Sequence, residues 1–238
     1  MPPVGLIVIG TDHRGTRSGD SDPHQTVKIW ERPADMTALL DHLLSDPPLG
    51  LQPDITRIAA LGFSLGGHSA LSLAGLRVNK ALFNDYCDSN AGLADCGWMQ
   101  RAGVDFTAID AARYAQSNRD PRITAVVAID PALPQAVPLD GVADISAQAL
   151  ILTLGEIDTV PEAMRADALA DRMGATFETI PGSAHFSFLA ECSMLGKVII
   201  GLAGEDDICS DRGLRSRTEI HDAVLTRSAP FLKAHFGL

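Results

Sequence analysis

One short glycine-rich turn constrains this chain more than any other feature. An apolar run over residues 58–61 leads into Gly62-Phe63-Ser64-Leu65-Gly66, and small residues follow it. The pattern predicts a buried strand, a sharp turn and a helix, with the Ser64 hydroxyl held clear of the backbone. We expect glycine at positions 62 and 66 because side chains there would clash. The start of the helix, beginning with the N–H of Leu65, would face negative charge that develops beside the serine.

Strands and helices alternate along the rest of the chain. Apolar runs predict strands at residues 4–9, 123–129, 149–154 and 176–180, and helical patterns fall at 33–44, 67–75, 161–173 and 217–235. Such alternation predicts an α/β fold with a doubly wound, mostly parallel sheet. We expect a single domain over residues 1–238. Residues 80–120 are the least regular, and two interpretations stay open: a lid or cap insertion, or a surface excursion without a catalytic role.

An activated serine needs a base, and the base needs an acid that orients it. Open α/β sheets place their working residues just beyond the C-terminal ends of the strands. His185 follows the last predicted strand, so it is the predicted base. Two acids compete: Asp158, on the turn after residues 149–154, and Asp130, at the end of residues 123–129. We favour Asp158, because the strand nearer the histidine loop is the commoner donor, and keep Asp130 as the alternative.

Charge and cysteine content restrict the partners and the compartment. The net charge of −11 argues against binding of nucleic acid or anionic membranes as the main activity. No apolar run is long enough to span a bilayer, so we expect no stable membrane insertion. Cys87 with Cys96 and Cys192 with Cys209 would fit two disulfides in a periplasmic or secreted protein. Four reduced thiols in a cytoplasmic protein are the alternative.

Four stretches of the chain, GFSLGGHSALSLAG, DPRITAVVAIDPAL, LILTLGEIDTVPEAM and PGSAHFSFLAEC, carry a family resemblance. They resemble predicted dienelactone hydrolases and bacterial acetylhydrolases and, more distantly, platelet-activating-factor acetylhydrolases. The resemblance covers nearly the whole chain from Val4 and implies an α/β-hydrolase that acts on carboxylic esters. It places the acid at Asp158 by analogy with the bacterial relatives, or at Asp130 by analogy with the platelet-activating-factor enzymes. Dienelactone hydrolase itself uses a cysteine where this chain has Ser64.

The resemblance also implies a departure near the start. Members usually carry, before a segment like residues 4–15, a strand ending in a His-Gly loop that supplies one oxyanion-hole N–H. We therefore expect the N-terminal strands to be missing, with an exposed sheet edge that invites a homodimer. Two alternatives stay open for the oxyanion hole: the chain is a truncated product, or another backbone N–H, in the loop of residues 12–15, substitutes beside that of Leu65.

These observations lead to one hypothesis and its alternatives. The hypothesis is a serine ester hydrolase with a small-molecule ester substrate, no metal and no cofactor. The alternatives are a non-catalytic, hydrolase-like binding or scaffold protein, and an acyltransferase or amidase with the same triad.

Overall fold

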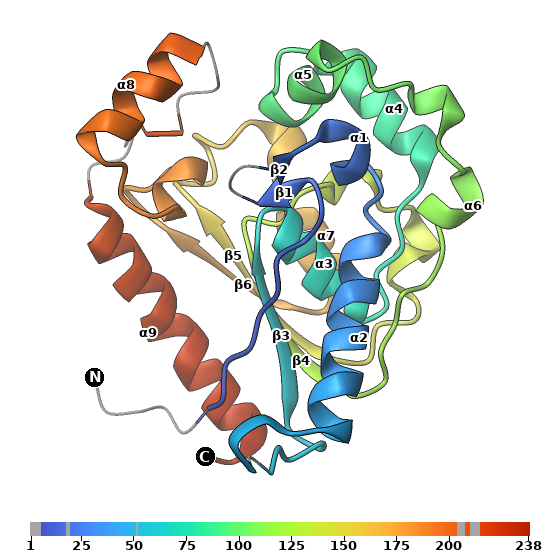
Figure 1. Cartoon of the computed structure of the whole chain (residues 1–238), viewed down its shortest axis with the longest axis vertical. Coiled ribbons are helices and arrows are strands. Elements are labelled where there is room, and N and C mark those ends of the chain that lie inside the picture. The colour runs from blue at the N-terminus through green and yellow to red at the C-terminus, as the bar shows by residue number, and fades with distance from the viewer. Residues whose placement is uncertain (1–5, 18–19, 51, 204–207, 210–214) are drawn as a thin grey trace.

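A four-stranded parallel sheet forms the centre of the computed structural model, which describes residues 6–17, 20–50, 52–203, 208–209 and 215–238. The strands are β3 (Ile58–Phe63), β4 (Ile123–Ile129), β5 (Gln148–Leu154) and β6 (Thr176–Ile180), and they lie side by side in that order (Figure 1). All three neighbouring pairs are parallel. The structure therefore confirms the predicted α/β fold with a mostly parallel sheet.

Helices cover both faces of this sheet (Figure 1). One face carries α2 (Glu31–Ser45), α3 (Leu65–Leu73) and α7 (Asp167–Met173), and the other carries α9 (Arg217–Phe236). Successive residues of β4 alternate between the two cores: Val126 packs in the first and Val127 in the second. Because side chains of a strand point to opposite faces in turn, a strand covered on both sides reads as a continuous apolar run.

The segment of residues 80–120 is more regular than the sequence suggested. It contains α4 (Lys80–Ser89), α5 (Ala94–Arg101) and α6 (Ala111–Tyr114), and the Cys87–Cys96 disulfide joins the first two. Phe83 and Tyr114 are buried in the same core as α2 and α3. The segment is thus packed onto the sheet domain through apolar contacts, and a role as a lid stays a prediction.

The strand expected at residues 4–9 does not form over the part that the structure describes. Residues 6–9 are irregular, with Ile7 54% and Val8 90% exposed, and residues 4 and 5 lie outside the described chain. An extended segment needs a neighbouring strand to satisfy its N–H and C=O groups, and none pairs with residues 6–9 among the described residues. In the described chain β3 is consequently an edge strand, and its Leu61 is 57% exposed.

Other differences from the sequence prediction are local. The helix expected at 161–173 is split, because Arg165 is extended between a short 3-10 helix, Glu162–Met164, and α7. The helix α8 (Met194–Ala203) was not predicted. The expected loop of residues 10–25 holds two short strands and the start of a short helix, β1 (Thr16–Arg17), β2 (Asp20–Ser21) and α1 (Pro23–Thr26). The remaining 3-10 helices are Pro48–Gly50, Phe106–Ala108, Pro134–Ala136, Leu139–Val142 and His185–Phe188.

Candidate active site

Ser64 lies on the sharp turn between β3 and α3. Its backbone has φ 53° and ψ −120°, a conformation that costs a non-glycine residue about 1–3 kcal/mol. Two hydrogen bonds hold the turn against the end of β4: the Ser64 N–H donates to the Ile129 carbonyl at 2.9 Å, and the Ala132 N–H donates to the Ser64 carbonyl at 3.0 Å. These contacts fix the serine at the C-terminal edge of the sheet.

The glycines around this turn differ in what they permit. A Cβ on Gly62 would lie 2.1 Å from the carbonyl oxygen of Gly66, so position 62 requires glycine. A Cβ on Gly67 would lie 3.1 Å from Cα of Pro131, which is tight. A Cβ built on Gly66 would meet no described atom within 4 Å apart from its chain neighbours and the backbone of its own helix. The expected clash is therefore correct for position 62 and wrong for position 66, because the backbone of residue 66 is itself what fills the space beside Gly62.

His185 opens the 3-10 helix His185–Phe188 after β6, and its loop is tied down on both sides. The Ser183 hydroxyl donates to the Ile180 carbonyl, and the Ala184 N–H donates to the Ser187 hydroxyl oxygen at 2.8 Å. The imidazole Nε2 then lies 3.0 Å from Oγ of Ser64. Its partners assign the tautomer with the proton on Nδ1, which leaves Nε2 free to accept the serine proton.

Asp130, and not Asp158, lies against this histidine. Its Oδ2 is 2.5 Å from Nδ1 of His185, and the Leu154 N–H donates to its Oδ1 at 3.3 Å. The Asp130 side chain is only 10% exposed. Asp158 lies in the exposed turn after β5 and makes no side-chain hydrogen bond or ion pair with a described residue. The geometry therefore favours the alternative acid over the one that the sequence analysis preferred.

A backbone donor suited to an oxyanion stands beside the serine. Leu65 is the first residue of α3, so its N–H has no acceptor one turn earlier in the helix. The loop of residues 12–15 was expected to add a second donor, but the Gly15 N–H donates to Oδ2 of Asp20 at 3.3 Å. That N–H is engaged elsewhere in this structure.

His68 lies under the turn on α3 and has a different character from His185. Burial disfavours its charged form, and the nearby Arg32 guanidinium adds to this, so the pKa of His68 is lowered to about 4. The imidazole is 2% exposed, and its Nδ1 has no hydrogen-bond partner among the described residues. It is a neutral, structural side chain of the helix core.

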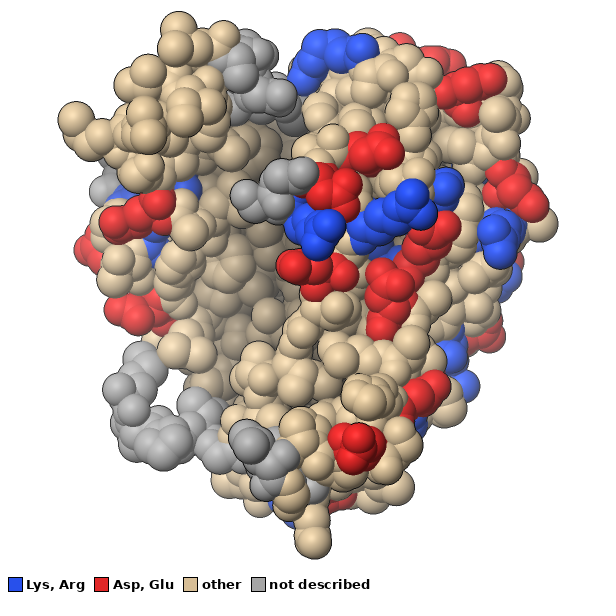
Figure 2. Space-filling model, viewed as in Figure 1, with Lys and Arg blue, Asp and Glu red and all other residues tan. Residues whose placement is uncertain are grey.

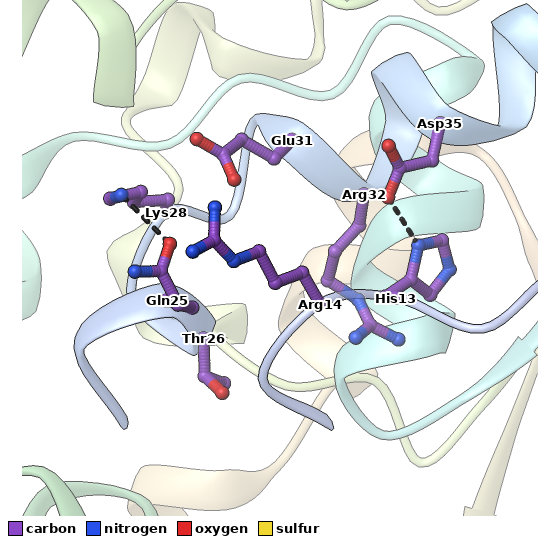
Figure 3. A pocket seen from close by; sticks show the side chains of 8 residues that line it. All are labelled: His13, Arg14, Gln25, Thr26, Lys28, Glu31, Arg32 and Asp35. Carbon is purple, nitrogen blue, oxygen red and sulfur yellow. Dashed lines mark hydrogen bonds and ion pairs between the residues drawn. The ribbon is translucent and has the colours of Figure 1, made fainter. Parts of the chain in front are cut away.

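A charged pocket of about 140 Å³ lies near α3, and neither Ser64 nor His185 lines it (Figure 3). Its lining residues are His13, Arg14, Gln25, Thr26, Lys28, Glu31, Arg32 and Asp35. Arg32 links it to α3, because its Nε donates to the Ser69 hydroxyl oxygen at 3.2 Å. Its lining has three basic side chains, Arg14, Lys28 and Arg32, against two carboxylates, and His13 pairs with Asp35 at 2.9 Å. This pocket is next to the serine turn and is separate from it.

Within the part of the chain that the structure describes, no cluster of three or more His, Cys, Asp and Glu side chains could hold a metal ion. Likewise, no helix of the described residues is long and apolar enough to cross a membrane. Both predicted cysteine pairs, Cys87–Cys96 and Cys192–Cys209, are disulfide-bonded.

Comparison with known proteins gives a structural neighbour and no close relative. No protein-family model matches the sequence, and no curated protein matches it. A ferulic acid esterase from Streptomyces cinnamoneus is similar in structure, with a TM-score of 0.50 at 18% sequence identity. This similarity extends to the α/β fold. The alignment covers 94% of this chain and 57% of the esterase, so the chain spans little more than half the length of its neighbour.

Proposed function

We propose that the chain is a serine hydrolase that cleaves carboxylic esters. The observation that carries this proposal is the hydrogen-bonded series from Ser64 through His185 to Asp130 at the C-terminal edge of a parallel sheet. Open α/β sheets bind their substrates at this edge. The similarity in fold to a ferulic acid esterase, and the sequence resemblance to acetylhydrolases and dienelactone hydrolases, support ester hydrolysis over other acyl chemistry.

In the proposed reaction Ser64 attacks the acyl carbonyl while Nε2 of His185 takes the hydroxyl proton. Asp130 holds the imidazole through Nδ1 and stabilises the imidazolium that forms. The N–H of Leu65 donates to the oxyanion of the tetrahedral intermediate. The imidazolium then protonates the leaving alcohol, and an acyl-enzyme on Ser64 remains. Water, deprotonated by His185, releases the acid and restores the serine.

A fluorophosphonate probe and a chromogenic ester test this assignment together. The probe should label the wild type at Ser64, and Ser64→Ala should neither be labelled nor hydrolyse p-nitrophenyl acetate. Circular dichroism of both proteins establishes that the variant is folded. A folded wild type that resists labelling would overturn the enzyme assignment and favour a non-catalytic, hydrolase-like binding protein.

The compartment and the partners follow as further parts of the proposal. Two disulfides favour an oxidising compartment, such as the periplasm or the outside of the cell. The open outer side of β3 favours pairing with a second copy of the chain. Sedimentation of the purified protein at several concentrations tests the second point.

A further inference from the structure

Helix α8 presents its apolar side to solvent. Met194, Leu195, Val198, Ile199 and Leu202 are each between 56% and 87% exposed. At 3.6 residues per turn these five side chains share an arc of about 140°. The partly buried positions 196 and 200 lie on the opposite side, toward the protein. Surface helices normally turn their apolar side inward, so this orientation is inverted.

The base of the segment that carries α8 is cross-linked. The Cys192–Cys209 disulfide joins its two ends. Arg217, which is 2% exposed, donates from its guanidinium to the Ala190 carbonyl on one side and to the Ile208 carbonyl on the other. A covalent bond and a buried guanidinium thus anchor the two ends of the segment that carries α8 to the rest of the fold.

Aromatic side chains surround His185 at the start of the stretch of chain that leads to α8. His185 lies nine residues before Met194, and its ring is 4.8 Å from that of Phe63 and 5.1 Å from that of Phe186. Phe188 continues the cluster, with its ring 5.1 Å from Phe63. Phe186 and Phe188 thus lie in the stretch of chain that leads from His185 to α8, and Phe63 packs against His185 and Phe188 from β3.

Three features decide what covers the exposed arc. The arc carries no charged or hydrogen-bonding side chain, and Lys197, the one charged residue of α8, is exposed outside the arc, as basic residues are in helices that lie in a lipid interface. Helix α8 projects from a corner of the molecule (Figure 1), and the space-filling view shows no charged side chain over it on that face (Figure 2). Finally, a net charge of −11 makes an anionic membrane repulsive at long range, but not a lipid surface without net charge.

We propose that α8 is an interfacial helix, which seats the protein on a zwitterionic or neutral lipid surface. Its ten residues lie in the interface without spanning it. This inference rests on the proposed function and deepens it: the esters that Ser64 attacks are lipid esters, delivered from the surface on which α8 sits.

The test measures vesicle binding and hydrolysis separately. The binding assay is flotation with phosphatidylcholine vesicles, and the variant combines Leu195→Ser, Ile199→Ser and Leu202→Ser. Leu139→Ser is the matched control, because Leu139 is an 86% exposed leucine on a 3-10 helix elsewhere on the surface. We expect wild type and control to float, and the triple variant to bind at least tenfold more weakly. Phosphatidylglycerol vesicles should bind the wild type less than phosphatidylcholine vesicles.

Two further measurements make each outcome decisive. Hydrolysis of dissolved p-nitrophenyl acetate should be equal in wild type and triple variant, whereas hydrolysis of an ester embedded in vesicles should fall at least tenfold in the variant. Ser64→Ala should float as the wild type does, because binding does not need the serine. A wild type that floats but hydrolyses neither ester would overturn the proposed function and leave the interfacial helix standing. The inference about α8 would be overturned if the wild type did not float or if the triple variant floated equally well. It would also be overturned if wild type and control were dimers and the triple variant a monomer.

Discussion

Ser64 and Asp130 end neighbouring parallel strands at directly paired positions. Phe63 of β3 lies opposite Ile129 of β4, and each of the next residues has positive φ, 53° for Ser64 and 45° for Asp130. The register of the sheet therefore sets the separation of the proposed nucleophile and acid before any loop is placed. The loop after β6 has only to bring the ring of His185 between them.

Replacement of Asp130 by asparagine should abolish most of the activity. An amide at position 130 cannot hold the imidazole in the required tautomer, and loss of this function in a serine triad costs on the order of 10⁴-fold in kcat. Asp158→Asn is the matched control, and its kcat should stay within about twofold of the wild type, because Asp158 lies in an exposed turn. Steady-state kinetics on p-nitrophenyl acetate decides between them, and the reverse ranking would restore Asp158 as the acid.

A methyl group at position 62 should destabilise the protein far more than one at position 66. The added Cβ at Gly62 would lie 2.1 Å from a backbone oxygen, and overpacking of this kind costs at least about 1–3 kcal/mol. Gly66 is helical with open space at its Cβ, so Gly66→Ala should be neutral or stabilise by up to about 1 kcal/mol. Urea unfolding monitored by circular dichroism gives both values. Equal loss in the two variants would contradict the geometry of the turn.

His68 should make the fold sensitive to acid. Its pKa falls from 6.5 to about 4 on folding, so the unfolded chain takes up a proton below pH 6.5 while the folded protein does not. The free energy of unfolding therefore decreases as the pH falls from 6.5 to about 4, by about 3 kcal/mol in total. His68→Leu removes this contribution. The wild-type value minus the variant value, from urea unfolding at pH 7, 5.5 and 4.5, should decline along the series, and a constant difference would contradict the assignment.

The sequence predicted the strands better than the site, for physical reasons. β4 is buried on both faces, so its residues are apolar without interruption and its bounds follow from the pattern. The choice between Asp130 and Asp158 depends on where the chain turns after each strand. Both residues follow a strand and precede proline within three positions, so no local signal separates them. The contact of Asp130 with His185 and the positive φ of Asp130 are three-dimensional features that the sequence does not display.

Helix α8 was not predicted from the sequence, and the reason is the direction of its apolar side. A surface helix is normally recognised by an apolar side that packs inward, and in this segment the apolar side faces outward. The strand prediction is wrong over residues 6–9 for a related reason. Apolar composition shows that a segment can be buried, but whether a neighbouring strand is there to pair with it is a property of the whole sheet.

The two disulfides should contribute to stability in different ways. Cys87 and Cys96 are buried in the core that α4 and α5 share, and closing a loop of this length stabilises a fold by about 2–3 kcal/mol. Cys87→Ala with Cys96→Ala should lower the free energy of unfolding by that amount. Cys192→Ala with Cys209→Ala should instead loosen the segment that carries α8, which protease cleavage between residues 192 and 209 would reveal. Free thiols detected in the native protein would contradict this assignment. So would urea unfolding of the Cys87→Ala, Cys96→Ala variant that equals that of the wild type.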